Sequence, residues 1–566
     1  MAYIAKYPRS AGVLMPVTML HGPFGIGVLG AEAREFIDFL SGAGFHAWQI
    51  LPIEHTGKGF SPYKCLSAFA GEPMLIDPRM LLTMGLIGAD DLKERASGVS
   101  VDFVDYGLIK DKQQRLLKKA YSRLQGRGGA AAAVAQTAAP TPTTTTTPTP
   151  TPTTSTSPAT SVTALATATA TRAPATATRA PATVAVEPMT IPTLAAADWL
   201  DAYALYIAIK AGFNDKPWYE WPDESLRRHD ASAVKEAGKE LREEIGFYKF
   251  VQSIFNEQWR SLREYAASRG VSIIGDMPFY VSEDSAEVWS RRRLFNADPN
   301  GKFAAVGGAP PDYFSPNGQH WGNPVYNWPV MKKEGYKWWV NRIGAALDRY
   351  DYVRLDHFRG FDSYWSIPWD APDARGGRWV RGPGMALFEA IEVSLGKGNM
   401  RLIAEDLGDT HGNVDKLLAD TGLRGMRVLQ FGFLGDDKHL PHNITEDCVA
   451  YTGTHDNTTL LAWLFELAPQ DRERALFYIG FDGDWTKGGP NCSVVKAWIR
   501  ALFASGASLA VVPIQDLLGY GADTRTNTPG APEGNWRFRI RADATRRIDA
   551  GFYKTLIETT LRDNKL

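Results

Sequence analysis

Short apolar segments of strand length recur along the chain, and amphipathic segments of helix length lie between several of them. Eight apolar segments predict β-strands: Gly12–Leu20, His46–Ile53, Val271–Val281, Tyr352–Phe358, Leu402–Leu407, Met426–Phe433, Val449–Thr454 and Leu509–Leu517. Four amphipathic stretches predict helices, namely Ala31–Ser41, Phe247–Ser268, Gly335–Leu347 and Asn413–Asp420. Strands that alternate with helices in this way predict a parallel sheet covered by helices.

Several of the predicted strands end in polar residues that are able to do chemistry. These residues are Asp276, Asp356, Glu405, Asp456, Gln515 and Asp516. In a closed (β/α)8 barrel, functional residues gather at the C-terminal ends of the strands. We therefore expect an α/β fold of the (β/α)8 TIM-barrel type. No GxGxxG or Walker-type loop is present, which argues against a dinucleotide-binding or P-loop fold.

One long segment, residues 129–193, differs from the rest of the chain in composition. It consists largely of Ala, Thr, Pro and Ser, and its only charged residues are Arg172, Arg179 and Glu187. Such a segment cannot bury enough apolar surface to offset the entropy lost on ordering. Candidate catalytic sequence continues on both sides of it. We therefore expect a single catalytic barrel over residues 1–566, interrupted at 129–193 by a disordered low-complexity insertion.

Composition and charge restrict the possible partners. The 566 residues carry a net charge of −1, so nothing indicates a nucleic acid or an anionic membrane as a partner, and no obligate protein partner is evident. No run of about 18 apolar residues predicts a membrane span. The cysteines, Cys65, Cys448 and Cys492, form no CxxC pair, and Met1–Ser10 has no signal-peptide pattern. These features predict a cytoplasmic protein.

The segment from Arg354 to Gly360 holds the first candidate catalytic acid. Alternate residues of a strand share one face, so Arg354, Asp356 and Phe358 are expected to point together. A cation beside Asp356 (Arg354, and Arg359 from the following loop) is expected to lower its pKa and keep it ionised, as a nucleophilic carboxylate requires. The alternative is a buried structural Arg–Asp pair.

The second candidate lies in Leu402–Gly408, where Glu405 and Asp406 are adjacent. One of them must face inward and the other outward, and the spacing does not say which. A catalytic acid/base needs a raised, near-neutral pKa, which burial at an apolar strand end gives to Glu405. Asp406 is a candidate helix N-cap.

The third candidate lies in the sequence Gly453–Asn457. If the strand continues, Thr454 and Asp456 share one face, and His455 and Asn457 share the other. A His–Asp pair can also bind metal, but no HExxH-type pattern accompanies it. We expect His455, and likewise His357 beside Asp356, to hydrogen-bond sugar hydroxyls; the alternative is a structural histidine.

Three carboxylates at strand ends satisfy the needs of glycoside chemistry, which uses a nucleophile, an acid/base and a third acid that holds the sugar. The loop Gly308–Pro324 adds Tyr313, Phe314 and Trp321, whose rings could stack on a glucan chain. The alternative for these aromatic residues is a rigid surface loop with buried anchors.

Several motifs, in order along the chain, closely resemble the amylomaltase (4-α-glucanotransferase) family of the α-amylase superfamily, in its bacterial form. The motifs are Trp48–Pro52, Ser61–Tyr63, Ser67–Gly71, Gly275-Asp276, Pro310–Pro324, Arg354–Phe361, Ala404–Gly408, Gly453–Asn457, Gln515-Asp516, Arg525–Asn527 and Gly534–Trp536. The resemblance runs from about Gly12 to the C-terminus, apart from the insertion. It implies a barrel with inserted, mainly helical subdomains and no separate C-terminal β-domain.

The resemblance also implies an activity. A 4-α-glucanotransferase moves an α-1,4-glucan segment from a donor, a maltooligosaccharide or a starch-type glucan, to the 4-hydroxyl of an acceptor glucan or glucose. The mechanism is a retaining double displacement, which belongs to starch and glycogen metabolism and needs neither a cofactor nor a metal.

By position in these motifs, Asp356 matches the family nucleophile, Glu405 the acid/base and Asp456 the transition-state stabiliser. The positions that match substrate contacts are Arg354, His455, Tyr63, Asp276, Trp321 and Asn527. Three positions depart from the family pattern, Val28, Glu72 and Thr526, and none of them is catalytic.

Three other functions share some of these features. An α-glucan hydrolase would use the same three acids and pass the sugar to water. A non-catalytic glucan-binding protein would have lost at least one acid, whereas all three are present. A phosphorylase would need a lysine for pyridoxal phosphate and a phosphate site, and no pattern for either is found.

Overall fold

The computed structural model describes residues 9–137, 198–298, 301–311, 315–408, 413–531 and 533–566. It divides into two compact units, one of Met1–Tyr121 with Ile191–Leu566 and the other of Ser122–Thr190. Helix α4 (Tyr106–Thr137) extends past position 129, where the sequence predicts the insertion to begin. The alanine-rich run there has high helix propensity. The rest of the predicted insertion, 138–193, lies outside the described residues.

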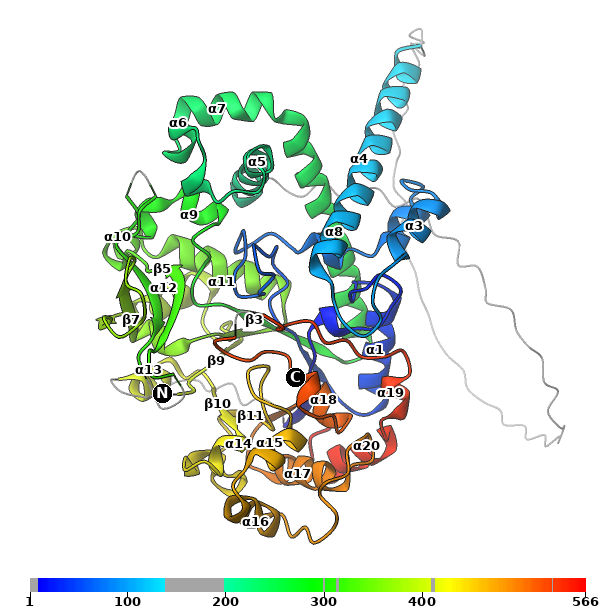
Figure 1. The fold of residues 1–566 in the computed structure, drawn as a ribbon, viewed down its shortest axis with the longest axis vertical. Helices are drawn as coiled ribbons and strands as arrows, with labels where there is room; N and C mark the ends of the chain where they lie inside the picture. The colour runs from blue at the N-terminus through cyan, green and yellow to red at the C-terminus, as the bar shows by residue number, and fades with distance from the viewer. Residues whose placement is uncertain (1–8, 138–197, 299–300, 312–314, 409–412, 532) are drawn as a thin grey trace, which may run out of the picture. The chain divides into compact units, whose positions relative to one another are not determined.

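Eight parallel strands form the barrel of the first unit (Figure 1). They pair in the order β10-β11-β12-β1-β2-β3-β6-β9, and the Ala404 amide closes the ring by donating to the Arg424 carbonyl at 2.7 Å. The strands are β1 Ser10–Leu14, β2 Ala47–Gln49, β3 Ser272–Met277, β6 Tyr352–Leu355, β9 Leu402–Ala404, β10 Gly425–Val428, β11 Cys448–Tyr451 and β12 Leu509–Pro513. The eight predicted strands and the TIM barrel are thus confirmed.

Most barrel strands are shorter than the apolar segments that predicted them. Strand β6 ends at Leu355, and β12 passes at Pro513 directly into helix α18 (Ile514–Leu517). Helix α14 (Leu429–Gly432) likewise occupies the second half of a predicted strand. Buried parallel strands and buried helical turns both appear in the sequence as continuous apolar runs, so hydrophobicity alone does not separate them.

The barrel interior is filled by side chains from successive strands. They include Leu14 of β1, Ile274 of β3, Ile403 of β9 and Val511 of β12, all at most 2% exposed. The C-terminal residue, Leu566, packs against the same cluster, near the middle of Figure 1. The barrel is therefore a packed core, and room for a ligand exists only beyond the strand ends.

Helices surround the barrel, and the four predicted from the sequence are confirmed within a few residues as α1, α8, α11 and α13. Neighbouring helices contact one another in the series α8–α1–α20–α17 and α11–α12–α13. Their bounds are α1 Ala31–Gly42, α8 Arg242–Ser268, α11 Lys337–Arg349, α12 Met385–Leu395, α13 Val414–Thr421, α15 Leu460–Glu466, α16 Pro469–Tyr478, α17 Ser493–Ala504, α19 Ala544–Arg547 and α20 Ala550–Thr559.

Long insertions follow strands β2 and β3, and they are mainly helical. Their helices are α2 Pro78–Thr83, α3 Ala89–Ala96, α5 Asp198–Gly212, α6 Glu224–Arg227, α7 Ala231–Glu240, α9 Ala286–Ser290 and α10 Trp328–Lys333. In the described part of the chain no strand follows Pro513, so no C-terminal β-domain appears there. No helix in that part has the length and hydrophobicity of a transmembrane segment.

A second, antiparallel sheet was not predicted from the sequence. Its order is β5-β4-β7-β8, with bounds β4 Ala305–Ala309, β5 Gln319–Pro324, β7 Ser363–Pro368 and β8 Arg378–Arg381. The segment Gly308–Pro324, expected to be a loop throughout, ends in strand β5. This strand lies at an edge of the sheet, where glycine and proline are tolerated because one side needs no partner.

Candidate active site

Two of the three predicted catalytic acids directly follow neighbouring strands. Asp356 is the residue after β6 and Glu405 is the residue after β9, and β6 pairs with β9. Their amides continue the barrel pairing by one residue, because Asp356 donates to the Met277 carbonyl and Glu405 to the Leu355 carbonyl, each at 3.0 Å. The pairing of the strands thus places both carboxylates at the same end of the barrel.

Arg354 links two acids at the barrel mouth. Its Nη1 atom donates to both carboxylate oxygens of Asp276, at 2.8 and 2.7 Å, and to Oδ1 of Asp356 at 3.0 Å. The Asp276 side chain is fully buried, whereas that of Asp356 is 27% exposed. Asp356 is therefore the member of this group that an incoming molecule can reach.

The pKa of Asp356 differs from the sequence-based expectation. Burial raises it, the charges of Asp276 and Asp456 also raise it, and Arg354 only partly opposes them, so that the pKa of Asp356 lies at about 7. The expectation that Arg354 would keep this pKa low was wrong, because the burial of the carboxyl outweighs the effect of the neighbouring guanidinium.

Glu405 is held by two backbone amides. His357 N–H donates to its Oε2 at 2.7 Å, and Leu407 N–H donates to Oε1 at 3.0 Å. Burial raises the pKa of Glu405, and the charge of Asp356 also raises it, while Arg354 lowers it, so that this pKa lies at about 8. The shift has the direction that the sequence predicted.

The adjacent acid, Asp406, faces away from this site. Its Oδ1 accepts from the Met426 amide at 2.6 Å, and its Oδ2 accepts from Arg427 Nη1 at 2.9 Å. Both donors belong to strand β10, so Asp406 joins β9 to β10 across the closure of the barrel. The interpretation of Asp406 as a helix N-cap was wrong.

The third acid, Asp456, lies in a turn beyond β11. Because the strand ends at Tyr451, the face alternation expected for residues 454–457 does not apply. The turn is closed by Asn457, whose Oδ1 accepts from the Thr454 amide at 2.8 Å and from its hydroxyl at 2.9 Å. Consequently the neighbours His455 and Asp456 point together, with Nε2 and Oδ2 3.4 Å apart.

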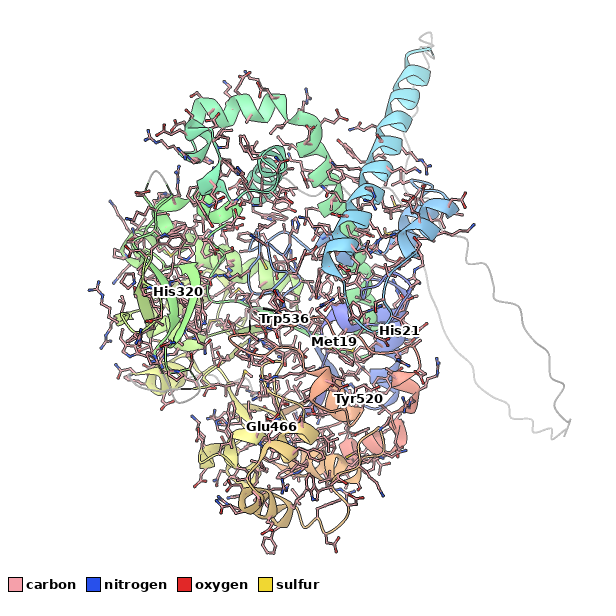
Figure 2. All side chains as sticks on the ribbon, in the orientation of Figure 1. Met19, His21, His320, Glu466, Tyr520 and Trp536 are labelled. Carbon is pink, nitrogen blue, oxygen red and sulfur yellow. The ribbon has the colours of Figure 1, made fainter. Side chains whose placement is uncertain are left out.

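Tyr63 links Asp276, in strand β3, to His455, in the turn beyond β11. Its hydroxyl donates to Asp276 Oδ2 at 2.8 Å and lies 2.9 Å from His455 Nε2. Its ring stacks on the His455 ring at a centroid distance of 5.4 Å. Trp536, labelled in Figure 2, lies within 6 Å of both rings and also borders a pocket of about 530 Å³ with Met19.

The C-terminal part of the chain holds Asp456 from the other side. Asn527 Nδ2 donates to Asp456 Oδ1 at 2.5 Å, and Arg525 Nη2 donates to the Asp456 carbonyl at 2.5 Å. The sequence assigned no role to Arg525 or Trp536. The motifs Arg525–Asn527 and Gly534–Trp536, which contain them, were the signal that could have found them.

Trp321 of β5 and His357 form an aromatic contact beside Glu405. Their ring centroids are 5.0 Å apart at an angle of 87°, and Phe279 packs against the same imidazole. Burial lowers the pKa of His357 to about 3, so this ring is neutral. Tyr313 and Phe314, predicted to stack on a glucan, lie outside the described residues.

The arrangement offers a partly exposed carboxylate beside a guanidinium, a second carboxyl that holds a proton near neutral pH, and a third carboxylate fixed by an amide. Such a set suits nucleophilic attack combined with proton transfer. Among the described residues, no group of three or more His, Cys, Asp or Glu side chains is arranged to hold a metal ion.

Comparison with known proteins gives consistent matches. A family model described as 4-alpha-glucanotransferase matches residues 15–139 and 191–545. The chain is 38% identical to the 4-alpha-glucanotransferase of Thermus thermophilus over 540 residues, covering 94% of this chain and 95% of that protein. It is 37% identical to the 4-alpha-glucanotransferase of Aquifex aeolicus over 552 residues, covering 97% and 98%.

A solved structure matches equally broadly. The amylomaltase from Streptococcus agalactiae in complex with acarbose is 33% identical to this chain, with a TM-score of 0.81. The match covers 98% of this chain and all of that one.

Proposed function

The chain belongs to the 4-alpha-glucanotransferase family and is an enzyme of that class, and from this premise we propose that Asp356, Glu405 and Asp456 carry out a retaining transfer between α-1,4-glucans. The observation that carries the proposal is the position of Asp356 and Glu405 at the ends of the paired strands β6 and β9. Two carboxyls held close, with raised pKa values, together carry one exchangeable proton near neutral pH.

In the first step, a carboxylate oxygen of Asp356 attacks the anomeric carbon of the donor glucan. The bond from that carbon to the departing 4-oxygen breaks, and Glu405 gives its proton to this oxygen. The pKa of about 8 supports Glu405 as the acid, because it still holds its proton at pH 7. The product is a glycosyl ester on Asp356 and a shortened glucan.

In the second step, the 4-hydroxyl of an acceptor glucan or glucose gives its proton to Glu405, and its oxygen attacks the anomeric carbon. The bond to Asp356 breaks and the acid is regenerated. One α-1,4 bond has replaced another, so the reaction needs no cofactor.

Asp456 is proposed to stabilise the positive charge that develops on the donor sugar in both steps. Its carboxylate is 44% exposed and is held in place by Asn527. A fixed negative group near a developing cation lowers the barrier without having to reorganise during the reaction.

The sugar itself is proposed to be bound by a shell around the three acids. Tyr63, Asp276, Arg354 and His455 form one hydrogen-bonded group on the barrel side. Trp321 and His357 form an aromatic side of the shell, and Asn527 lies on a third side, where it bonds to Asp456. Tyr313 and Phe314 are proposed as further stacking partners from the sequence alone.

We propose donors of the maltooligosaccharide or starch type, glucan or glucose acceptors, action without an obligate protein partner, and a cytoplasmic location. The three free cysteines, Cys65, Cys448 and Cys492, suit a reducing compartment.

The product profile from pure maltotriose tests the transfer reaction. We expect longer and shorter oligomers together with glucose on thin-layer chromatography, while the number of reducing ends stays constant. A rise in reducing ends without longer products would instead support the α-glucan hydrolase. An unchanged maltotriose sample would contradict both activities.

A further inference from the structure

A pocket lies behind the sugar-binding shell. It encloses about 600 Å³, including its mouth, and its walls come from strand β3, helix α11, the start of helix α5 and the loop at residues 63–69. Its lining includes buried residues such as Asp276 and Met277 and partly exposed ones such as Ala346 and Trp199. The pocket therefore runs from the protein surface towards the barrel mouth.

Several charged and polar side chains line this pocket beside apolar ones. Arg349 Nη1 donates to Glu54 Oε1 at 2.8 Å, while the second Glu54 oxygen has no hydrogen-bonding partner among the described residues. The same holds for the Tyr280 hydroxyl and for Nε of Arg342, and both of these side chains are more than nine-tenths buried. Buried polar groups of this kind are ordinarily satisfied by water. We infer that water fills the pocket.

Tyr63 and Asp276 belong both to the wall of this pocket and to the sugar-binding shell. The Tyr63 ring is fixed by its hydroxyl bonds to Asp276 and His455 and by stacking on His455. Asp276 is in turn fixed by Arg354. Of these two shared residues, Tyr63 has the larger side chain.

We propose that the Tyr63 ring is a specificity-determining partition, which keeps the water of this pocket away from the glycosyl ester on Asp356 and thereby favours transfer over hydrolysis. The inference rests on the proposed function. Water that passed this wall would attack the anomeric carbon and give a proton to Glu405. The bond to Asp356 would break, and a new reducing end would result.

The test compares Tyr63→Ala with Tyr63→Phe in the maltotriose assay, counting new reducing ends per transfer product. Tyr63→Ala is expected to raise this ratio at least about fivefold, because it opens the wall to water. Tyr63→Phe keeps the ring and loses the hydroxyl bonds, so its rate is expected to fall while the ratio stays near that of the parent enzyme. An equal ratio in Tyr63→Ala and the parent would overturn the proposal.

A second substitution identifies the source of the water. Ala346 lines the pocket on helix α11 and belongs to neither the catalytic group nor the sugar-binding shell. Adding Ala346→Leu to Tyr63→Ala fills the pocket and should return the ratio most of the way to the parent value, whereas Ala346→Leu alone should leave it unchanged. A double variant that hydrolyses as much as Tyr63→Ala would mean that water enters by the substrate groove, against the proposal.

The two proposals fail in different ways. If the parent enzyme forms no longer oligomers from maltotriose, the proposed transferase function fails. If the parent transfers normally but Tyr63→Ala does not change the ratio of new reducing ends to transfer products, only the proposed role of Tyr63 as a partition fails. Thermal unfolding of each variant shows whether it is folded in the assay.

Discussion

At the scale of single residues, the guanidinium of Arg354 is shared between two acids at the barrel mouth, Asp276 and Asp356. Arg354 is only 4% exposed and donates to Asp276 and Asp356 together. Asp276 is fully buried and takes two of the three bonds, so Asp356 is left with one and with an accessible oxygen. This unequal sharing leaves Asp356 both reactive and readily protonated.

Replacing Asp356 with asparagine should abolish turnover, because the amide is too weak a nucleophile to form the glycosyl ester. We expect kcat to fall by at least about 10⁴-fold, by analogy with the removal of other enzymic nucleophiles. Maltooligosaccharide binding, measured by calorimetry, should remain. Asp362→Asn is the matched control, since Asp362 lies in the same segment and its side chain accepts from the neighbouring Ser363 hydroxyl; its activity should stay within about twofold. Normal turnover by Asp356→Asn would refute the nucleophile assignment.

The pH dependence follows from the two raised pKa values. A carboxyl with a raised pKa stays protonated to higher pH, so Asp356 becomes a nucleophile only as the pH rises through about 7. Glu405 loses its proton, and with it the acid function, as the pH rises through about 8. A plot of kcat/KM against pH should therefore be bell-shaped, with a narrow maximum between these values that belongs to the pair of acids.

The Glu405→Gln variant isolates one limb of that profile. With an α-maltosyl fluoride donor, whose leaving group needs little protonation, this variant should lose the alkaline limb and keep the acidic limb. An alkaline limb that persists in the variant would show that another group controls it.

At the scale of secondary-structure elements, the site depends on a closed ring of strands. Strands β9 and β10 close the ring with few backbone bonds, and the Asp406 side chain reinforces the join. Gly425 leaves room for this carboxylate, since a Cβ atom there would lie 2.6 Å from Asp406 Oδ2. The residue beside the proposed acid/base is thus part of the barrel's closure.

Substitution of Asp406 by alanine should lower stability by about 3 kcal/mol, because it leaves the buried Met426 amide and the Arg427 guanidinium without this acceptor. Urea unfolding measures the change. The control is Asp420→Ala, which removes an exposed i,i+4 pair with Lys416 and should cost less than about 1 kcal/mol. Equal effects of the two substitutions would contradict a role for Asp406 in closure.

At the scale of the whole molecule, the proposed catalytic and sugar-binding groups are far apart in sequence but belong to one unit. Tyr63, Asp276, Asp456 and Asn527 are joined through hydrogen bonds, although 464 positions separate the first from the last. The family match covers residues 15–139 and 191–545, so it leaves out 140–190, the greater part of the low-complexity segment. The catalytic groups described here all lie in the matched ranges.

Replacement of residues 140–190 by a short Gly/Ser linker should therefore leave catalysis intact. We expect kcat on maltotriose within about twofold of the parent enzyme and a nearly unchanged Tm, since the free energy of closing a flexible connection changes only slowly with its length. Loss of activity, or a shift in product size with long glucans, would assign the segment a role in the enzyme.

The sequence by itself determined the eight-stranded barrel, because buried parallel strands are apolar runs, and it placed Asp356 and Glu405 at the ends of two of them. It also placed the acids within motifs that resemble one family. Apolar segments and motifs each consist of residues close together in the sequence, so they can be found without knowledge of distant contacts.

Only the tertiary structure decided how the acids are used. The pKa of Asp356 depends on Asp276 through a shared arginine, and the orientation of Asp456 depends on a turn that begins after β11 ends. The antiparallel sheet that carries Trp321 also escaped prediction, because its edge strand contains glycine and proline. The Arg354–Asp276 contact joins residues 78 positions apart, and the Thr454–Asn457 turn depends on where strand β11 ends, so the apolar pattern records neither.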